Sequence, residues 1–319
     1  MVAILGVVGN ALLGLRVAVF TTPWLLHLFL ADILLSALLP ISAVAPGLAY
    51  DLSSRIAESV WRGIQFIFTG INRAQIIVSG AENLPRGESA IVIANHVEWT
   101  DFYLIQEAAI RCGMLGRCRW FAKQQLKWIP FLGWGLWAMG MPLVSRKWTV
   151  DQREMDRVFQ GVLQRKWPMW LVSYSEATRY TPSKRAEAEK WGAENNKSVA
   201  QHLLYPRSKG FIACVQKLRG APHVKAVYDM TIAYAKGGTT FQSPPSFWQS
   251  LMRPRLDRDW TFYIHVERHD LQKLPREDVQ LAGWLEERWL EKGERLERLN
   301  MLLAKNVPWE SETAMRMLD

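Results

Sequence analysis

The most informative feature of the sequence is an uninterrupted apolar run from Ala90 to Ala94 that stops abruptly at a polar cluster. The turn-forming sequence at residues 85–88, Pro-Arg-Gly-Glu, bounds the run on its other side. A short apolar segment of this kind is typical of a strand buried on both faces of a parallel or mixed sheet. We therefore expect an α/β fold with a mixed, largely parallel sheet flanked by helices, and polar side chains where this strand ends.

His96 and Asp101 lie in the polar cluster. On a continuous helix, side chains five positions apart point about 140° away from each other, so these two can meet only if the chain turns. We expect that turn, with Thr100 or Asp101 starting a helix over residues 102–111. A carboxylate beside one imidazole nitrogen fixes the tautomer, and the other nitrogen can then take a proton from a hydroxyl. The alternative is a buried histidine beside an unrelated helix cap.

Three further motifs follow this pair along the chain. They are Lys123–Trp134 running on to Val144–Trp148, then Glu176-Ala177-Thr178-Arg179, then Val227–Thr231. In this order the motifs resemble those of the glycerolipid acyltransferases, and within them the eukaryotic 1-acylglycerol-3-phosphate and lysophosphatidylinositol acyltransferase branch. Segments Pro206–Phe211, Trp284-Leu285 and Glu291-Lys292 also look like that branch. The likeness covers about residues 85–295.

The resemblance implies a glycerol-3-phosphate acyltransferase-like fold and a role for each motif. His96 is the general base of its His-x4-Asp motif, and Asp101 orients it. The substrate phosphate is held by Lys123 and Arg179, with Arg146 a weaker candidate, and the supporting residues are Asn95, Glu176 and Thr178. Glu176 is expected to hold either Arg179 or a neighbouring backbone group.

The implied reaction transfers an acyl group from acyl-coenzyme A, as co-substrate, to the free hydroxyl of a lysophospholipid. The acceptor we expect is 1-acyl-sn-glycerol-3-phosphate, which gives phosphatidic acid; lysophosphatidylinositol or another lysophospholipid is the alternative. A non-catalytic lipid-binding membrane protein is the more remote possibility. We expect no cofactor and no metal, and no Gly-x-Ser-x-Gly motif supports a serine hydrolase.

Two positions depart from the family pattern. Ala177 stands where the family usually has glycine, and Ser175 stands where proline or cysteine is commoner. Alanine resists positive φ angles, so we expect this loop to be either differently shaped or strained.

The net charge of +9 is concentrated in two stretches that contain no acidic residue, residues 108–150 and 195–228. Such fields attract phosphate, acidic lipid headgroups or nucleic acid. No zinc-finger, RNA-recognition or basic-zipper pattern is present, so we expect lipids and acyl-coenzyme A as partners and no nucleic acid. The cysteines, Cys112, Cys118 and Cys214, have neither disulfide-framework nor zinc-site spacing and fit a reducing, cytosol-facing environment.

Residues 1–50 contain only two formally charged side chains, Arg16 and Asp32. Prolines divide the apolar sequence into about residues 2–20 and 24–50, each long enough to span a bilayer or to lie half-submerged as a hairpin. We expect this pair of hydrophobic helices to attach the protein to a membrane. A signal peptide is the competing interpretation, but no small-residue cleavage site follows the first piece. The family resemblance implies the endoplasmic reticulum, with the catalytic domain facing the cytosol.

The remaining chain divides into an amphipathic connector at 51–74, an acyltransferase domain at 75–305 and a polar tail at 306–319 that we expect to be loose. Within the domain, periodicity predicts helices over 150–165 and 280–303 and strands over 169–174, 223–234 and 260–268. We expect residues 237–258 to form a loop. Asp229 and His265, both within predicted strands, are expected to be structural.

Overall fold

The computed structural model describes residues 2–80, 84–129, 132–145, 148–311, 314 and 317–318, without the side chains of 2–10, 132, 148–150 and 152. The sequence assigned Arg146 to the candidate site, and this residue lies outside the described part of the chain.

A seven-stranded sheet forms the centre of the domain, in the order β1-β9-β7-β2-β6-β3 with β8 paired to β7. Its strands are β1 (Ile76–Ser79), β2 (Ser89–Ala94), β3 (Cys118–Trp120), β6 (Trp170–Tyr174), β7 (Val224–Lys236), β8 (Thr240–Phe241) and β9 (Trp260–Asp270). β2 runs parallel to β6 and β7, β3 runs parallel to β6, and β9 runs antiparallel to β7. The sheet is therefore mixed and mostly parallel, which confirms the predicted fold class.

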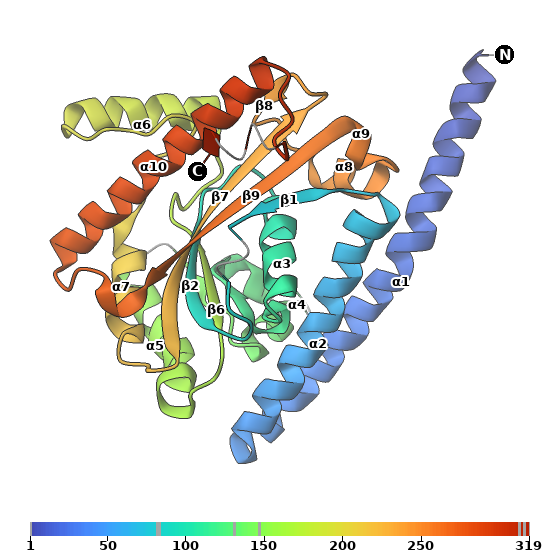
Figure 1. Cartoon of the computed structure of the whole chain (residues 1–319). Coiled ribbons are helices and arrows are strands. Elements are labelled where there is room, and N and C mark those ends of the chain that lie inside the picture. The colour runs from blue at the N-terminus through green and yellow to red at the C-terminus, as the bar shows by residue number, and fades with distance from the viewer. Residues whose placement is uncertain are drawn as a thin grey trace.

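Two layers of helices cover the sheet (Figure 1). One layer contains α5 (Trp148–Arg165), α7 (Ser208–Leu218) and α10 (Asp278–Ala304), and the other contains α3 (Asp101–Arg111) and the end of α2 (Pro46–Phe66). Ile91 and Ile93 of β2 belong to the first core, whereas Ala90, Val92 and Ala94 belong to the second. Because successive side chains of a strand point to opposite faces, one apolar run supplies both cores. This explains the absence of polar residues between Ala90 and Ala94.

Apart from the N-terminal helix described below, the remaining elements are short, and the longest of them is α6. They are the π-helical turn Ile67–Ile71, the 3-10 turns Leu115–Arg117, Gln124–Trp128 and Leu271–Lys273, a two-stranded sheet of β4 (Ala122–Lys123) and β5 (Leu143–Val144), and helices α4 (Leu132–Ala138), α6 (Pro182–Glu194), α8 (Phe247–Met252) and α9 (Leu256–Asp259).

The N-terminal helix pair exists, but its boundary differs from the prediction. α1 is one continuous helix, Val2–Val44, that passes through Pro23 and Pro40, and α2 returns beside it (Figure 1). Near the prolines, Thr21 Oγ1 donates to Val17 O at 2.6 Å and Ser36 Oγ donates to Asp32 O at 2.8 Å, each one turn back along the helix. Prolines are tolerated in apolar helices of membrane proteins, where neighbouring helices and local adjustments of the backbone compensate for the missing N–H groups, and α2 packs along α1. The expected break at residues 21–23 was therefore wrong, and the chain turns at Ala45, just before a further proline.

The α1 helix is apolar enough, over Ala11–Val44, to cross a membrane by length and composition. Only 17% of its most apolar window is buried inside the protein. Arg16, one of its two charged residues, donates hydrogen bonds to Ile71 O at 3.1 Å and Asn72 Oδ1 at 2.6 Å. This arginine therefore ties α1 to the chain that follows α2.

Two predictions about the C-terminal half were wrong. Residues 237–258 are not a simple loop, since they contain β8, α8 and α9, with a capping box of Ser246 and Gln249 starting α8. The tail is not loose where it is described, because Trp309, Ala314 and Leu318 are buried in the core beneath α10. The Nε1 of Trp309 donates to Leu299 O at 3.0 Å. Scattered apolar residues in a polar segment gave no periodic signal for this packing.

Candidate active site

Asn95 fixes the end of β2 against β7. Its side-chain amide donates to Ile232 O at 3.0 Å and accepts from Ile232 N at 2.8 Å. The amide therefore replaces a strand pairing at the point where the backbone leaves the sheet. His96 follows directly, at the carboxyl end of a central strand, where ligand sites of such sheets lie.

His96 and Asp101 meet across a tight turn, as predicted. The distance from His96 Nδ1 to Asp101 Oδ2 is 2.7 Å. The same oxygen accepts the backbone N–H groups of Val97 at 2.7 Å and Glu98 at 3.1 Å. Asp101 is also the first residue of α3, so its carboxylate closes the turn and fixes the imidazole together. The alternative of an unrelated helix cap is thereby excluded.

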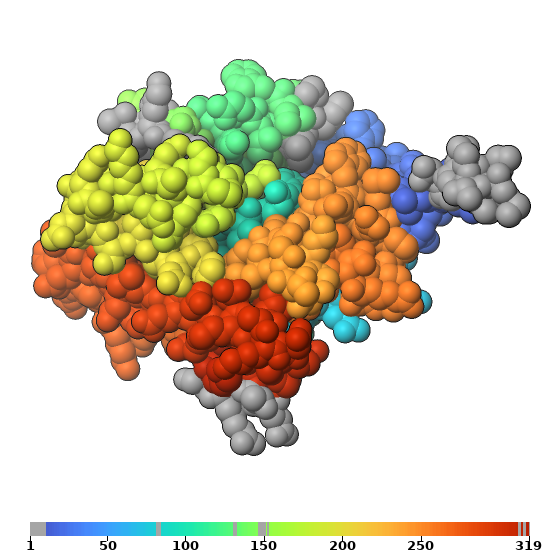
Figure 2. Space-filling view, turned by 90° about the horizontal axis from the view of Figure 1, so that it is seen from above, coloured from blue at the N-terminus to red at the C-terminus, as the bar shows by residue number. Residues whose placement is uncertain are grey.

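The environment of this pair leaves one imidazole nitrogen available. The carboxylate of Asp101 is fully buried, whereas the His96 side chain is 19% exposed. A buried carboxylate accepting from Nδ1–H selects the tautomer in which Nε2 carries the free lone pair. No described residue forms a hydrogen bond with Nε2. Figure 2 shows the chain around the end of β2, in teal, reaching the surface between the yellow α6 and the orange segment around α8.

β6, which ends next to β2, supplies an aromatic ring that stacks on the imidazole of His96. The ring of Tyr174, the last residue of β6, stacks on that of His96 with 4.0 Å between centroids and 15° between planes. The carbonyl of His96 accepts the N–H of Tyr180 at 2.7 Å. β2 and β6 end level with each other, since Ala94 pairs with Tyr174. The predicted convergence of two strand ends therefore occurs.

Tyr234 is a site residue that the sequence analysis missed. Its hydroxyl donates to Asp101 Oδ1 at 2.6 Å, so both carboxylate oxygens are occupied. Burial and the neighbouring Asp101 carboxylate raise the pKa of Tyr234 well above its ordinary value, which keeps the hydroxyl protonated as a donor. This tyrosine lies on β7, in an alternating strand that also contains Tyr228. No local signal distinguishes the two tyrosines.

Glu176 holds backbone groups, which was one of its two predicted roles. Its carboxylate accepts His96 N at 3.2 Å, Leu204 N at 3.2 Å and Trp289 Nε1 at 3.3 Å. Burial raises the pKa of Glu176 to about 8, although these hydrogen bonds lower it and the Asp101 charge raises it further. Glu176 therefore links α10 to the backbone of the histidine.

Ala177 adopts the left-handed conformation, with φ of 57°. Its N–H donates to Tyr174 O at 2.9 Å, which closes a tight turn after β6. The sequence predicted either a different loop shape or strain, and the outcome is the strained glycine-like conformation.

Arg179 lies beside the histidine loop but is already paired. Its guanidinium forms a short ion pair with Glu98, and 48% of its side chain is exposed. Glu98 is two residues from His96, so the cation lies at the rim of the site. Thr178 accepts a hydrogen bond from Lys184 Nζ, and Lys184 also bonds Arg179 O at 3.4 Å. The predicted contact between Glu176 and Arg179 is absent from the described bonds.

Lys123 ends β4 and is exposed. β4 follows β3, and β3 pairs in parallel with β6, so Lys123 lies beyond the same edge of the sheet as His96. Its role at a phosphate stays a prediction, as does that of Arg146. Within the described residues, no cluster of three or more histidine, cysteine or carboxylate side chains could hold a metal ion.

Comparison with known protein families identifies the class of protein to which this sheet and its His–Asp pair belong. A family model described as Acyltransferase matches residues 75–235, and one described as Acyltransferase C-terminus matches residues 258–301. The chain belongs to the acyltransferase family.

Several relatives are named as glycerolipid acyltransferases. The "probable 1-acyl-sn-glycerol-3-phosphate acyltransferase 5" of Arabidopsis thaliana is 29% identical over 69% of this chain and 56% of its own length. The mouse epsilon 1-acyl-sn-glycerol-3-phosphate acyltransferase is 30% identical over 78% of this chain and 68% of its own. Lysocardiolipin acyltransferase 1 of Danio rerio is 27% identical over 83% of this chain and 66% of its own. The chain spans less than two thirds of the length of the plant relatives.

The crystal structure of the 1-acyl-sn-glycerophosphate acyltransferase PlsC from Thermotoga maritima aligns with 83% of this chain and 96% of that chain, at 18% identity. The TM-score of this alignment is 0.44.

Proposed function

We propose that this protein transfers an acyl group from acyl-coenzyme A to the free hydroxyl of a lysophospholipid, with 1-acyl-sn-glycerol-3-phosphate as acceptor and phosphatidic acid as product. The observation that carries the proposal is the 2.7 Å contact between His96 Nδ1 and a fully buried Asp101 carboxylate. Membership of the acyltransferase family and the names of the relatives support the same reaction. Acyl-coenzyme A is a co-substrate, and the reaction requires no cofactor.

In this mechanism Nε2 of His96 takes the proton of the acceptor hydroxyl while Asp101 supports the imidazolium through Nδ1–H. The oxygen attacks the thioester carbonyl carbon, and the resulting tetrahedral intermediate collapses with cleavage of the carbon–sulfur bond. Coenzyme A leaves as a thiolate, which takes up the proton. No acyl-enzyme forms, because the acceptor oxygen attacks the thioester directly.

The acceptor phosphate is held at the rim of the site by Arg179, with Lys123 and Arg146 as further cations. A guanidinium presents planar paired donors that match phosphate geometry. Glu98 holds the Arg179 side chain beside the histidine loop until the phosphate displaces it. Fixing the phosphate also fixes the hydroxyl near Nε2, and such positioning can supply several kcal/mol of barrier reduction.

We propose further that the long apolar α1 attaches the protein to a membrane, that of the endoplasmic reticulum, with the catalytic domain facing the cytosol. Exposed leucines on α1, such as Leu25, Leu26 and Leu34, support membrane contact, because exposed apolar surface of this extent is unfavourable in water.

The test is release of free coenzyme A by the purified full chain, with one thioester donor and a panel of acceptors. The panel contains 1-acylglycerol-3-phosphate, lysophosphatidylinositol and lysocardiolipin. We expect the highest kcat/KM with 1-acylglycerol-3-phosphate. A higher kcat/KM with lysocardiolipin would instead support the acceptor in the name of the Danio rerio relative. Absence of coenzyme A release with every acceptor would contradict the proposal and favour a non-catalytic lipid-binding protein.

A further inference from the structure

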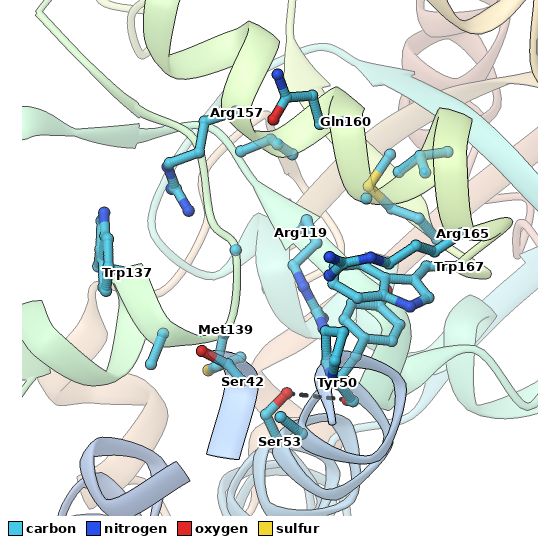
Figure 3. A pocket seen from close by; sticks show the side chains of 18 of the residues that line it. Ser42, Tyr50, Ser53, Arg119, Trp137, Met139, Arg157, Gln160, Arg165 and Trp167 are labelled. Carbon is cyan, nitrogen blue, oxygen red and sulfur yellow. Dashed lines mark hydrogen bonds between the residues drawn. The ribbon is translucent and has the colours of Figure 1, made fainter. Parts of the chain in front are cut away.

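A cavity of about 240 Å³ lies between the turn of the N-terminal helices and the domain. The end of α1, the start of α2, α4 and α5 line it, together with Arg119 of β3 and Met169 just before β6. Figure 3 shows Arg119, Arg157 and Arg165 around this space. The cavity is separate from the candidate active site, because β6 starts at the cavity and ends at Tyr174. At about 3.3 Å per residue, the two sites are roughly 16 Å apart along that strand.

The lining of the cavity is cationic. Arg119, Arg157 and Arg165 are its charged side chains, and none of its described lining residues is acidic. Glu154 pairs with Arg157 at 2.6 Å, so Arg119 and Arg165 are the lining cations that form no ion pair with a described carboxylate.

Arg119 is the most unusual of these residues, because it is buried without a carboxylate partner among the residues described. It is 1% exposed and donates to Gly116 O, Cys118 O and Ser54 Oγ, all neutral acceptors, at 2.9 to 3.0 Å. Its buried Nε has no hydrogen-bond partner in the described part of the chain. Burying a charge is unfavourable unless an opposite charge compensates it. An anion in the adjoining cavity would supply that compensation.

A stacked pair of aromatic rings contacts the guanidinium groups of Arg119 and Arg165. The rings of Tyr50 and Trp167 stack with centroids 4.3 Å apart. The Arg119 guanidinium lies 5.0 Å from the Tyr50 centroid, and that of Arg165 lies 5.3 Å from the Trp167 centroid. These cation–π contacts hold both arginines without neutralising them. The fixed positive charges are therefore available to a ligand.

The opposite wall is apolar and comes from Leu35, Leu38 and Leu39 of α1. A volume of about 240 Å³ is below the roughly 300 to 1,000 Å³ typical of sites for drug-sized ligands, so it suits a headgroup rather than a whole lipid. We propose that this cavity binds a phosphate group, and the apolar wall favours one carried by an anionic glycerolipid rather than free phosphate. Such a ligand would join the N-terminal helices to the domain.

The experiment titrates the full chain in detergent with dihexanoyl phosphatidic acid, dihexanoyl phosphatidylcholine and inorganic phosphate, using calorimetry. We expect dihexanoyl phosphatidic acid to bind and the zwitterionic lipid to bind at least tenfold more weakly. Inorganic phosphate that binds as tightly as the lipid would assign the cavity to a free phosphate. Failure of both phosphate probes to bind would overturn the proposal.

Variants separate this cavity from the active site. Arg119→Met and Arg165→Gln should each weaken phosphatidic acid binding about tenfold or more. Arg165 is exposed, so its variant tests the proposal even where Arg119→Met fails to fold. Arg153→Gln, an exposed arginine of α5 outside the lining, is the matched control and should bind normally. Loss of binding in Arg179→Gln, with normal binding in both cavity variants, would assign the phosphate to the active site and contradict this proposal.

Discussion

The hydroxyl of Tyr234 donates a 2.6 Å hydrogen bond to Oδ1 of Asp101, whose other oxygen lies 2.7 Å from His96 Nδ1. The imidazole is therefore positioned by a chain of three side chains, not by a pair. The carboxylate cannot rotate without breaking bonds to the tyrosine and to the two backbone N–H groups of the turn.

Removing this hydroxyl should affect turnover more than acceptor binding. We expect Tyr234→Phe to lower kcat roughly tenfold, because the carboxylate loses orientation, while KM stays within about threefold of wild type. The lost bond should also lower the free energy of unfolding by about 1.5 to 3 kcal/mol. Tyr228→Phe is the control, since Tyr228 lies on β7 like Tyr234 but donates to Glu88, just before β2, at 2.5 Å. It should lose stability without losing kcat, and equal kcat in the two variants would count against the positioning role.

The sequence predicted the His–Asp pair because both residues lie in one short segment whose turn is locally encoded. It could not predict Tyr234, which comes from another strand and reaches Asp101 only through the pairing of β2 with β7. The same reason applies to Trp289, which binds Glu176 from α10. Contacts of this kind depend on strand order and helix docking, which periodicity does not specify.

Glu176 should make stability depend on pH. Burial raises the pKa of Glu176 to about 8, from a reference value of 4.5. Between these pH values the folded protein binds more protons at this group than the unfolded chain does. Its contribution to the free energy of unfolding therefore falls as pH rises from about 4.5 to 8, by up to a few kcal/mol in total.

Urea unfolding in detergent at pH 5, 6, 7 and 8 measures this effect. Glu176→Gln cannot titrate, so the difference in stability between wild type and this variant should shift against wild type as pH rises. A difference that stays constant over this range would show that the carboxyl group is not held in its protonated form.

Ala177 offers a test in the stabilising direction. Its φ of 57° is unfavourable for alanine and free for glycine. We expect Ala177→Gly to raise the free energy of unfolding by up to about 1 kcal/mol, since relief of about 1 to 2 kcal/mol is partly offset by the greater freedom of unfolded glycine. Thermal unfolding checks this. The exposed helical Ala186→Gly should instead destabilise by about 1 kcal/mol, and a fall in Tm for both variants would argue against strain at Ala177.

Arg179 should act on acceptor binding. We expect Arg179→Gln to raise KM for 1-acylglycerol-3-phosphate by about 10- to 100-fold, as expected for loss of a charged hydrogen bond of about 1.5 to 3 kcal/mol. The KM for the thioester donor should stay unchanged. Arg62→Gln removes another exposed ion pair, with Glu58 on α2, and should leave both constants unchanged. An unaltered acceptor KM in Arg179→Gln would place the phosphate elsewhere.

The N-terminal segment shows where composition is informative and where it is not. Low charge predicted an apolar helix, and α1 is one. The prolines led to a wrong boundary, because α1 continues through Pro23 and Pro40 and ends only at Val44. In the tail, Trp309 bonds α10 and packs edge-on against Phe241 and Tyr263, and such contacts leave no repeat in the sequence.

The central claim is that His96 is the general base, and coenzyme A release by purified His96→Ala tests it most directly. With 1-acylglycerol-3-phosphate as acceptor, we expect kcat to fall by about 10²- to 10⁴-fold. The stability of the variant in detergent and its association with membranes should match those of the wild type. His27→Ala, which changes a histidine bonded to Ser59 between α1 and α2, should retain full activity. A folded His96→Ala protein that turns over at the wild-type rate would contradict the account.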